Sequence, residues 1–239
     1  MIALSVNVNK VALLRNSRGH DVPNVQQIAL DCIRFGADGI TIHPRPDGRH
    51  IRKADAYSLK EILPVELNVE GYPSEEFLKM VCEIKPAQCT LVPDPPQALT
   101  SSFGWDTISQ KDFLYSVVCR LQDAGIRVSL FIDPQPEKII AAAETGTNRV
   151  ELYTGPYASQ FPGSPDVAIA EYIVAANTAI ACGLGINAGH DLSSQNLRFF
   201  ANRISGLEEV SIGHALIGDA LYWGLEKTIS IYKSQLQLD

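Results

Sequence analysis

The stretch VSLFIDPQPEKIIAAAETGTNRVELYTG, residues 128–155, decides the fold, because it contains two strand-like segments joined by a helix-like one. VSLFID and VELYTG are short runs rich in apolar and β-branched residues, which favour strands. PEKIIAAAETG is typical of a helix and ends at Gly146, the residue type that commonly follows a helix before the next strand. A strand, a helix and a strand in this order predict parallel pairing.

The same alternation continues through the rest of the chain. Further strand-like segments are ALSVNV, GITIHP, VELNVE, CTLVPD, LGINAGH and VSIGHAL. Helix-like segments with apolar residues three and four apart lie between them, and the last is predicted over residues 221–236. Eight such units predict closure into a (β/α)8 TIM barrel with additional helices, a single domain over residues 1–239.

A doubly wound open sheet is the alternative fold. Such a sheet usually carries a glycine-rich dinucleotide fingerprint in its first turn. The corresponding segment here, VNVNKVALLRN at residues 6–16, contains no glycine. The barrel is therefore the favoured fold.

Composition excludes several classes of protein. Hydrophobic residues make up 46% of the chain, enough for a substantial core, and the net charge of −7 disfavours a general nucleic-acid binder. The five cysteines form no CxxC pair, which is typical of reduced core residues in a cytosolic protein. The chain enters a strand almost at once, without signal-peptide features, and no apolar run reaches the length of a membrane span. We expect a cytoplasmic protein with no membrane or nucleic-acid partner.

Polar side chains collect where the predicted strands end. In a barrel all strand ends face one rim, and active sites of this fold lie at that rim. Caps could account for each side chain alone, but convergence from several strands favours a site. The residues at these ends are Asn7, His43, Arg45, Glu70, Asp133, Glu151, His190 and His214.

Anion binding is indicated by the last two turns and by the basic segment after the second strand. INAGHDLS and VSIGHALIGDA each place Gly-His after a strand, and glycine lets an anion approach backbone N–H groups closely. Basic groups suited to phosphate accompany these turns. Together they predict room for more than one phosphate, and the residues are Gly189, Gly213, Gly218, Arg18, Arg45 and His50.

Two predicted loops exceed the usual length. PDPPQALTSSFGWDTISQ follows the fourth strand and TGPYASQFPGSPD the sixth. Each is either a lid or a flexible insert, and a closing lid would bring Thr100, Ser101 and Ser102 to a bound phosphate.

Metal binding is a competing explanation for the ring of histidine and glutamate. The His43 to His50 spacing matches no familiar ligand pair, and neither HExxH nor clustered cysteines are present. A site assembled from His43, Glu70 and His190 stays open as an alternative. Nothing in the sequence marks a bound redox cofactor.

Eight blocks of the chain resemble, in order, the motifs of the pyridoxine 5′-phosphate synthase family. They are VNVNKVALLRNSRG, GADGITIHPRPDGRHI, LNVE, KPAQCTLVPD, AGIRVSLFIDP, VELYTG, INAGHDL and SIGHALIGDAL. The resemblance implies a (β/α)8 barrel that assembles as a homo-octamer. It also implies condensation of two phosphorylated substrates, 1-deoxy-D-xylulose 5-phosphate and 3-amino-2-oxopropyl phosphate, to pyridoxine 5′-phosphate, inorganic phosphate and water, with no metal and no organic cofactor.

The resemblance also assigns roles to residues. It implies that His43 and Glu70 are general bases, that His190 is a general acid, and that Glu151 stabilises charged intermediates. It implies that the deoxyxylulose phosphate is bound by Arg45, His50 and Thr100. For the aminoketone phosphate it implies a set made of Asn7, Arg18, Asp191, Gly213 and His214.

Two positions depart from the family pattern. Many members have Asp-His where this chain has Asn9 and Lys10, which changes the charge near the deoxyxylulose phosphate. Asp191 stands where the family often has glycine, and its backbone N–H can still supply a phosphate contact.

The chemistry itself favours these residue types. Amine attack on a ketone, loss of water, elimination of phosphate and ring closure each move a proton, which requires groups that titrate near the working pH. Glu70 ends an apolar strand, so burial is expected to raise its pKa. One alternative is an aldolase or isomerase in which Lys10 forms a Schiff base, and another is a non-catalytic barrel that binds phosphorylated metabolites. The presence of three proton-transfer groups, His43, Glu70 and His190, argues against the non-catalytic barrel.

Overall fold

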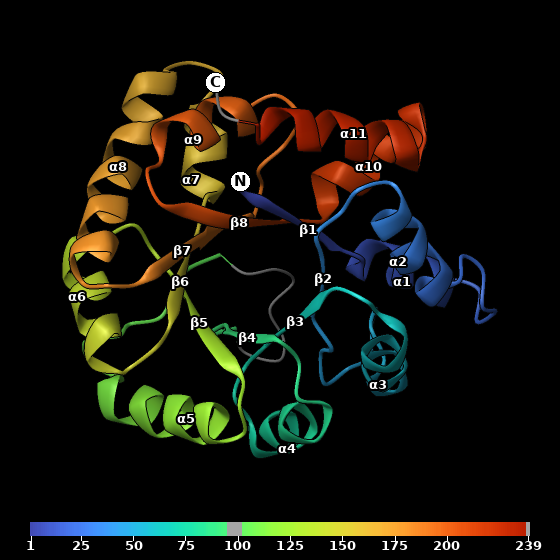
Figure 1. The fold of residues 1–239 in the computed structure, drawn as a ribbon, viewed down its shortest axis with the longest axis horizontal. Coiled ribbons are helices and arrows are strands. Elements are labelled where there is room, and N and C mark those ends of the chain that lie inside the picture. Colours follow the sequence, from blue (N-terminus) through green and yellow to red (C-terminus); the bar gives the residue numbers. More distant parts are fainter. Residues whose placement is uncertain (95–101, 238–239) are drawn as a thin grey trace.

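The protein, in a computed structural model that describes residues 1–94 and 102–237, forms a closed barrel of eight parallel strands (Figure 1). Neighbours in sequence pair with one another, and the last strand closes the barrel against the first. The predicted (β/α)8 fold is confirmed. The strands are β1 (Ala3–Asn7), β2 (Gly39–Ile42), β3 (Glu66–Gly71), β4 (Gln88–Leu91), β5 (Arg127–Ile132), β6 (Arg149–Leu152), β7 (Gly185–Ala188) and β8 (Leu207–Ile212).

Helices surround the barrel on all sides (Figure 1). Apolar side chains on the outer faces of the strands pack against them, as with Leu4 in β1 and Ile40 in β2, both fully buried. No helix among the described residues is long and apolar enough to cross a membrane. The helices are α1 (Asn9–Asn16), α2 (Val25–Arg34), α3 (Lys53–Ile62), α4 (Glu75–Ile84), α5 (Lys111–Asp123), α6 (Pro136–Glu144), α7 (Gly155–Gln160), α8 (Pro165–Ala181), α9 (Leu197–Arg203), α10 (His214–Trp223) and α11 (Leu225–Gln235).

The segment after β6 differs from the sequence prediction. Residues 155–160 form helix α7, and its Tyr157 is fully buried with the hydroxyl donating to the Asn196 carbonyl at 2.8 Å. The predicted loop is therefore helical over these residues, and an aromatic ring anchors it to the core. The other long segment, after β4, includes residues 95–101, which lie outside the described residues. Thr100, expected to bind phosphate, is one of them.

The end of the chain also differs from the prediction. The single helix expected over residues 221–236 is wrong, because α10 and α11 are separate helices that meet at Gly224. Gly224 has φ 78°, in the left-handed region that favours glycine and interrupts an α-helix. α10 begins already at His214, directly after β8.

The inside of the barrel is polar. Ser5, Thr41, Asn68 and Thr90 occupy the inner faces of β1 to β4 and are all buried. Their side chains are joined by hydrogen bonds of 2.7 Å (Ser5 to Thr41), 3.5 Å (Asn68 to Thr41) and 3.1 Å (Thr90 to Asn68). Branched aliphatic residues usually fill this space. Because side chains two apart on a strand share a face, Glu70 points to the same side as Asn68.

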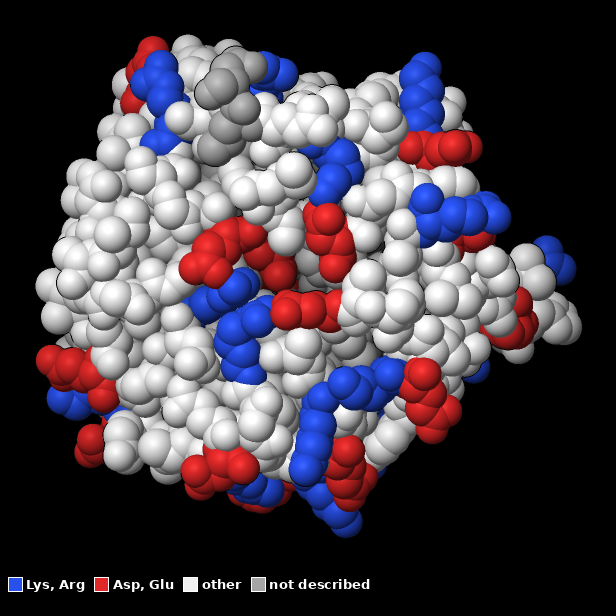
Figure 2. Space-filling view, viewed as in Figure 1, with Lys and Arg blue, Asp and Glu red and all other residues white. Residues whose placement is uncertain are grey.

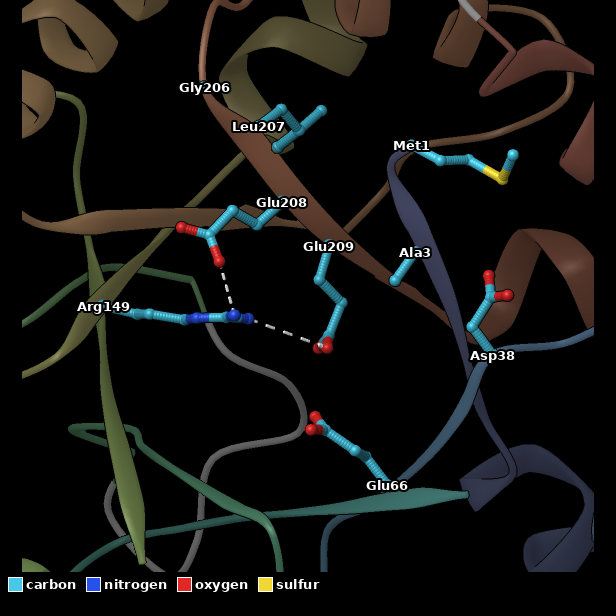
Figure 3. A pocket seen from close by; sticks show the side chains of 9 residues that line it. All are labelled: Met1, Ala3, Asp38, Glu66, Arg149, Gly206, Leu207, Glu208 and Glu209. Atoms are coloured by element: carbon cyan, nitrogen blue, oxygen red, sulfur yellow. Dashed lines mark ion pairs between the residues drawn. The ribbon is translucent and has the colours of Figure 1, made fainter. Parts of the chain in front are cut away.

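A cavity of about 540 Å³ opens at the end of the barrel where the strands begin (Figure 3). Arg149 lies across it, in an ion pair with Glu208 and 4.0 Å from Glu209. Acidic and basic side chains surround the hollow on this face of the molecule (Figure 2). The candidate catalytic residues belong to the opposite end, where the strands finish.

Candidate active site

His43 and Glu70 are brought together by the ends of neighbouring strands. His43 directly follows β2 and Glu70 lies near the end of β3, and Nδ1 of the histidine is 3.9 Å from Oε2 of the glutamate. The side-chain amide of Asn7, at the end of β1, donates to the same Oε2 at 3.4 Å. Asn9 accepts a hydrogen bond from the His43 backbone N–H at 2.9 Å. Three strands thus hold one imidazole beside one carboxyl group.

Burial sets the protonation of this pair. It raises the pKa of Glu70 well above its usual value, and the charges of Glu151 and Asp94 raise it further, as the sequence predicts in direction. Burial also lowers the pKa of His43 to about 3, with the nearby His50 and other positive groups adding to the effect. His43 is therefore a neutral imidazole at neutral pH. The neutral form is the one that can accept a proton.

Glu151 supplies a second buried carboxyl group. It lies in β6 with 3% of its surface exposed, and its Oε2 has no hydrogen-bond partner among the described residues. Burial raises its pKa to about 8, and the charge of Glu209 contributes in the same direction. A buried carboxyl oxygen with spare hydrogen-bonding capacity suits a group that meets a polar substrate.

Cationic side chains gather beside His43 in the segment after β2. Arg45 is buried, with Nη1 3.8 Å from Oδ2 of Asp94 after β4. The His50 ring meets the His43 ring edge-on, with centroids 6.2 Å apart. Burial, followed by the charges of Arg45 and Lys10, lowers the pKa of His50 to about 4. The positive charges that help to lower the pKa of His50 also favour the binding of an anion.

Helix α1 fixes this segment, and its role could not be seen in the sequence. Arg15 makes two hydrogen bonds to the Asp55 carboxylate, at 2.6 and 2.8 Å, and is almost fully buried. The Asn16 side-chain amide donates to the carbonyls of Gly48, Arg49 and His50, the last at 2.7 Å. Arg and Asn in an amphipathic segment give no signal of such a role by themselves. Arg18, predicted to bind phosphate, lies exposed just beyond this helix.

His190 and Asp191 occupy the turn after β7. Oδ2 of Asp191 is 2.8 Å from Nδ1 of His190, and the Tyr153 ring lies against the imidazole at 5.4 Å. Gly189 allows this turn to approach β8, because a Cβ there would lie 2.0 Å from the carbonyl oxygen of Ser211. The turn is therefore seated directly on the end of β8.

Gly213 and His214 lie at the start of α10, so their backbone N–H groups lie at a helix N-terminus, a position that favours anions. Gly218, expected with Gly189 and Gly213 in the phosphate-binding turns, lies instead inside α10. In the described part of the chain, no group of three or more His, Cys, Asp or Glu side chains is arranged to hold a metal ion.

The fold and the rim together are those of a (β/α)8-barrel enzyme, with buried titratable side chains where the strands end. Residues 4–238 match the family described as "Pyridoxal phosphate biosynthesis protein PdxJ". The chain belongs to this family.

Curated relatives are similar to this chain over its full length. Pyridoxine 5′-phosphate synthase of Bacteroides thetaiotaomicron is 56% identical over 99% of this chain and 100% of that protein. Its counterpart in Porphyromonas gingivalis is 55% identical, with complete coverage of both chains.

Solved structures of other enzymes share the fold alone. Tryptophan synthase of Mycobacterium tuberculosis superposes with a TM-score of 0.67 at 14% identity, covering 100% of this chain and 93% of that one. Phosphoribosylanthranilate isomerase of Thermotoga maritima superposes with a TM-score of 0.60 at 13% identity, covering 99% of this chain and 98% of that one.

Proposed function

We propose that this enzyme condenses 1-deoxy-D-xylulose 5-phosphate with 3-amino-2-oxopropyl phosphate to give pyridoxine 5′-phosphate, inorganic phosphate and water. The observation that carries the proposal is the neutral imidazole of His43 held 3.9 Å from the carboxyl group of Glu70 at the rim of the barrel. Names of relatives at 53–56% identity over nearly the whole chain support the same product.

Proton transfer is assigned to four side chains. His43, kept neutral by burial, accepts a proton, and Glu70 acts as a second base once a cationic intermediate offsets the burial that raises its pKa. His190, in the turn after β7, donates a proton to the oxygen that leaves as water. Glu151, which burial keeps protonated in the empty site, releases its proton to solvent when a positively charged intermediate forms beside it, and its carboxylate then stabilises that charge. No step in this scheme requires a metal ion or an organic cofactor.

The two phosphates are assigned to two sides of the rim. The cationic segment with Arg45 and His50 binds the deoxyxylulose phosphate, and Thr100 completes this set from outside the described residues. The start of α10 with Gly213 and His214 binds the aminoketone phosphate, joined by Asn7, Arg18 and the backbone of Asp191.

The Schiff-base alternative is less well supported. A lysine becomes a good nucleophile when it is desolvated or placed beside another cation. Lys10 lies exposed in the first turn of α1. Borohydride reduction in the presence of a ketose phosphate is therefore expected to leave Lys10 unmodified, and a covalent adduct at that residue would favour the aldolase-like mechanism.

Assembly as a homo-octamer is part of the proposal. Large apolar side chains are exposed on α1 and α10, two helices that contact each other. Such a patch marks a surface that binds protein. Its members are Leu13, Leu14, Leu221, Tyr222 and Trp223, and native mass spectrometry would give the number of subunits. We also propose a cytoplasmic location, in keeping with five free cysteines in the described structure.

The decisive assay mixes purified enzyme with both substrates, with and without a chelator, and follows pyridoxine 5′-phosphate by mass spectrometry. Product at equal rates in both samples supports the proposed reaction and its independence of metal. Absence of product, while both substrates bind, would refute the substrate assignment and direct the search to other ketose phosphates.

A further inference from the structure

We propose that Asp191 is a positioning residue for His190. Its carboxylate keeps the proton of the imidazole on Nδ1, so that Nε2 is the nitrogen that exchanges a proton with the substrate. The inference rests on the proposed acid role of His190 and adds a residue whose side chain has no assigned part in that reaction.

The contact between the two side chains carries the proposal. Oδ2 of Asp191 lies 2.8 Å from Nδ1 of His190, within the range of a charge-assisted hydrogen bond. An ionised carboxylate can only accept, so Nδ1 must be the donor and carry the proton. A carboxylate that fixes the tautomer and orientation of a histidine is a recurrent device in enzymes.

The rest of the histidine is held as well. The rings of Tyr153 and Phe131 meet the imidazole edge-on, with centroids 5.4 and 6.3 Å away. The Thr154 hydroxyl donates to the backbone carbonyl of His190. With two aromatic rings against the imidazole and its backbone anchored, the hydrogen bond to Asp191 selects between the two ring-flip orientations, since a flip would place a carbon atom against the carboxylate.

The backbone at Asp191 is a position where glycine would be easier to accommodate. Its φ is 67°, and Leu192 N–H donates to the Gly189 carbonyl at 3.0 Å to close a four-residue turn with Asp191 third. Glycine is favoured at the third position of turns with positive φ, and aspartate is among the few other residues that tolerate it. Asn196 steadies the turn by donating to the Asp191 carbonyl at 3.4 Å. An outlier of this kind at a candidate active site points to a use for the side chain.

The charges around Asp191 keep it in the form that the proposal requires. The hydrogen bond from His190 lowers the pKa of the Asp191 carboxyl group, and the charge of His214 at the start of α10 acts in the same direction. The other titratable groups near this turn are Tyr153 and Asp133, and burial raises the pKa of the Tyr153 phenol with help from both carboxylates. Asp191 is therefore a carboxylate beside a neutral phenol at neutral pH.

The proton balance is simple. Protonated His190, with hydrogens on both nitrogens, gives the Nε2 proton to the hydroxyl oxygen of an intermediate, whose C–O bond breaks to release water. The imidazole that remains is neutral and keeps its Nδ1 proton in the hydrogen bond to Asp191. Solvent returns a proton to Nε2 before the next turnover.

Two variants separate the charge of Asp191 from its shape. Asp191→Gly removes the side chain and suits φ 67°, whereas Asp191→Asn keeps a hydrogen-bond acceptor and also tolerates this φ. Asp166→Asn is the matched control, because Asp166 is 80% exposed in its side chain, pairs with Arg203 at 3.4 Å and lies outside the site. Steady-state kinetics with both substrates and ¹⁵N NMR of the imidazoles, with His190 assigned through His190→Gln, are measured on each protein.

In Asp191→Gly, kcat is expected to fall about 10- to 100-fold, a part of the contribution of a complete general acid. KM should stay constant or decrease, because the backbone N–H remains and a negative charge near the phosphate is lost. The His190 signals should shift from the Nδ1–H toward the Nε2–H tautomer, with Asp191→Asn intermediate and Asp166→Asn unchanged.

Wild-type kcat and an unchanged tautomer in both Asp191 variants would overturn the inference while leaving the proposed reaction intact. Conversely, a wild-type enzyme that makes no pyridoxine 5′-phosphate refutes the proposed function, and the tautomer shift then still tests the positioning of His190. A loss confined to KM would show that Asp191 acts on substrate binding and would also overturn the inference.

Discussion

Replacement of Glu151 by glutamine is expected to make the stability of the protein much less dependent on pH. The carboxyl group is buried inside the barrel, and burial raises its pKa from 4.5 to about 8. Between these values the folded protein holds a proton that the unfolded chain has lost. The contribution of this proton to the free energy of unfolding is therefore fully present below the pKa of the unfolded chain. It is lost as the pH rises toward the pKa of the folded protein, and glutamine removes this dependence.

The size of the effect follows from the width of that interval. Each pH unit within it lowers stability by about 1.4 kcal/mol. From about pH 5.5 to about pH 7.5, wild type should thus lose roughly 2 to 3 kcal/mol relative to Glu151→Gln. Any constant difference in hydrogen bonding between the two side chains cancels in this comparison, because it is the same at both pH values.

Urea unfolding of both proteins at the two pH values, at one fixed protein concentration, gives the four free energies of unfolding. Glu61→Gln, on the exposed face of α3, makes the same chemical change in solvent and should show no such difference. If Glu151→Gln and wild type differ by the same amount at both pH values, the carboxyl group does not hold its proton in the folded state and the argument for Glu151 fails.

Three further perturbations test the geometry of the rim. His43→Gln should reduce kcat by about 100-fold or more in the condensation assay, since it removes a base at 3.9 Å from Glu70, and unchanged turnover would refute that role. Gly189→Ala should destabilise the fold by about 2 kcal/mol or more and lower activity, because the new Cβ meets backbone atoms of β8 at 2.0 Å; a wild-type urea midpoint would contradict this. Arg15→Met should lower the unfolding free energy by about 3 kcal/mol by leaving Asp55 without its buried partner, and Arg15→Met combined with Asp55→Leu should recover much of the loss.

The strands were predictable from sequence because each is a short apolar run bounded by glycine or by polar residues. Gly36, Gly125, Gly146 and Gly183 all have positive φ and follow helices, as expected from their positions. The break at Gly224 was not predictable, because the apolar residues on both sides fit one continuous helical face. Helix α1 was missed for a related reason: its residues continue directly from a strand, with one intervening residue and no side-chain cap.

The contacts of the candidate site were only partly predictable. The barrel topology places His43 and Glu70 at one rim, but their 3.9 Å separation depends on the register between β2 and β3. The large pKa changes depend on burial, which periodicity indicates for strands but not for individual polar side chains. The pairing of Asp191 with His190 could be suspected only as a departure from the family pattern, because neighbours in sequence often point in different directions.

The polar lining of the barrel bears on how stability changes with temperature. Exposure of polar surface lowers the heat capacity of the unfolded chain, whereas exposure of apolar surface raises it. A barrel that hides hydroxyl and amide groups such as Thr41, Asn68 and Thr90, where others hide branched hydrocarbon, therefore has a smaller heat-capacity increment on unfolding for its size. Its stability curve is correspondingly flatter, so that cooling weakens the fold less than it weakens a barrel filled with aliphatic side chains.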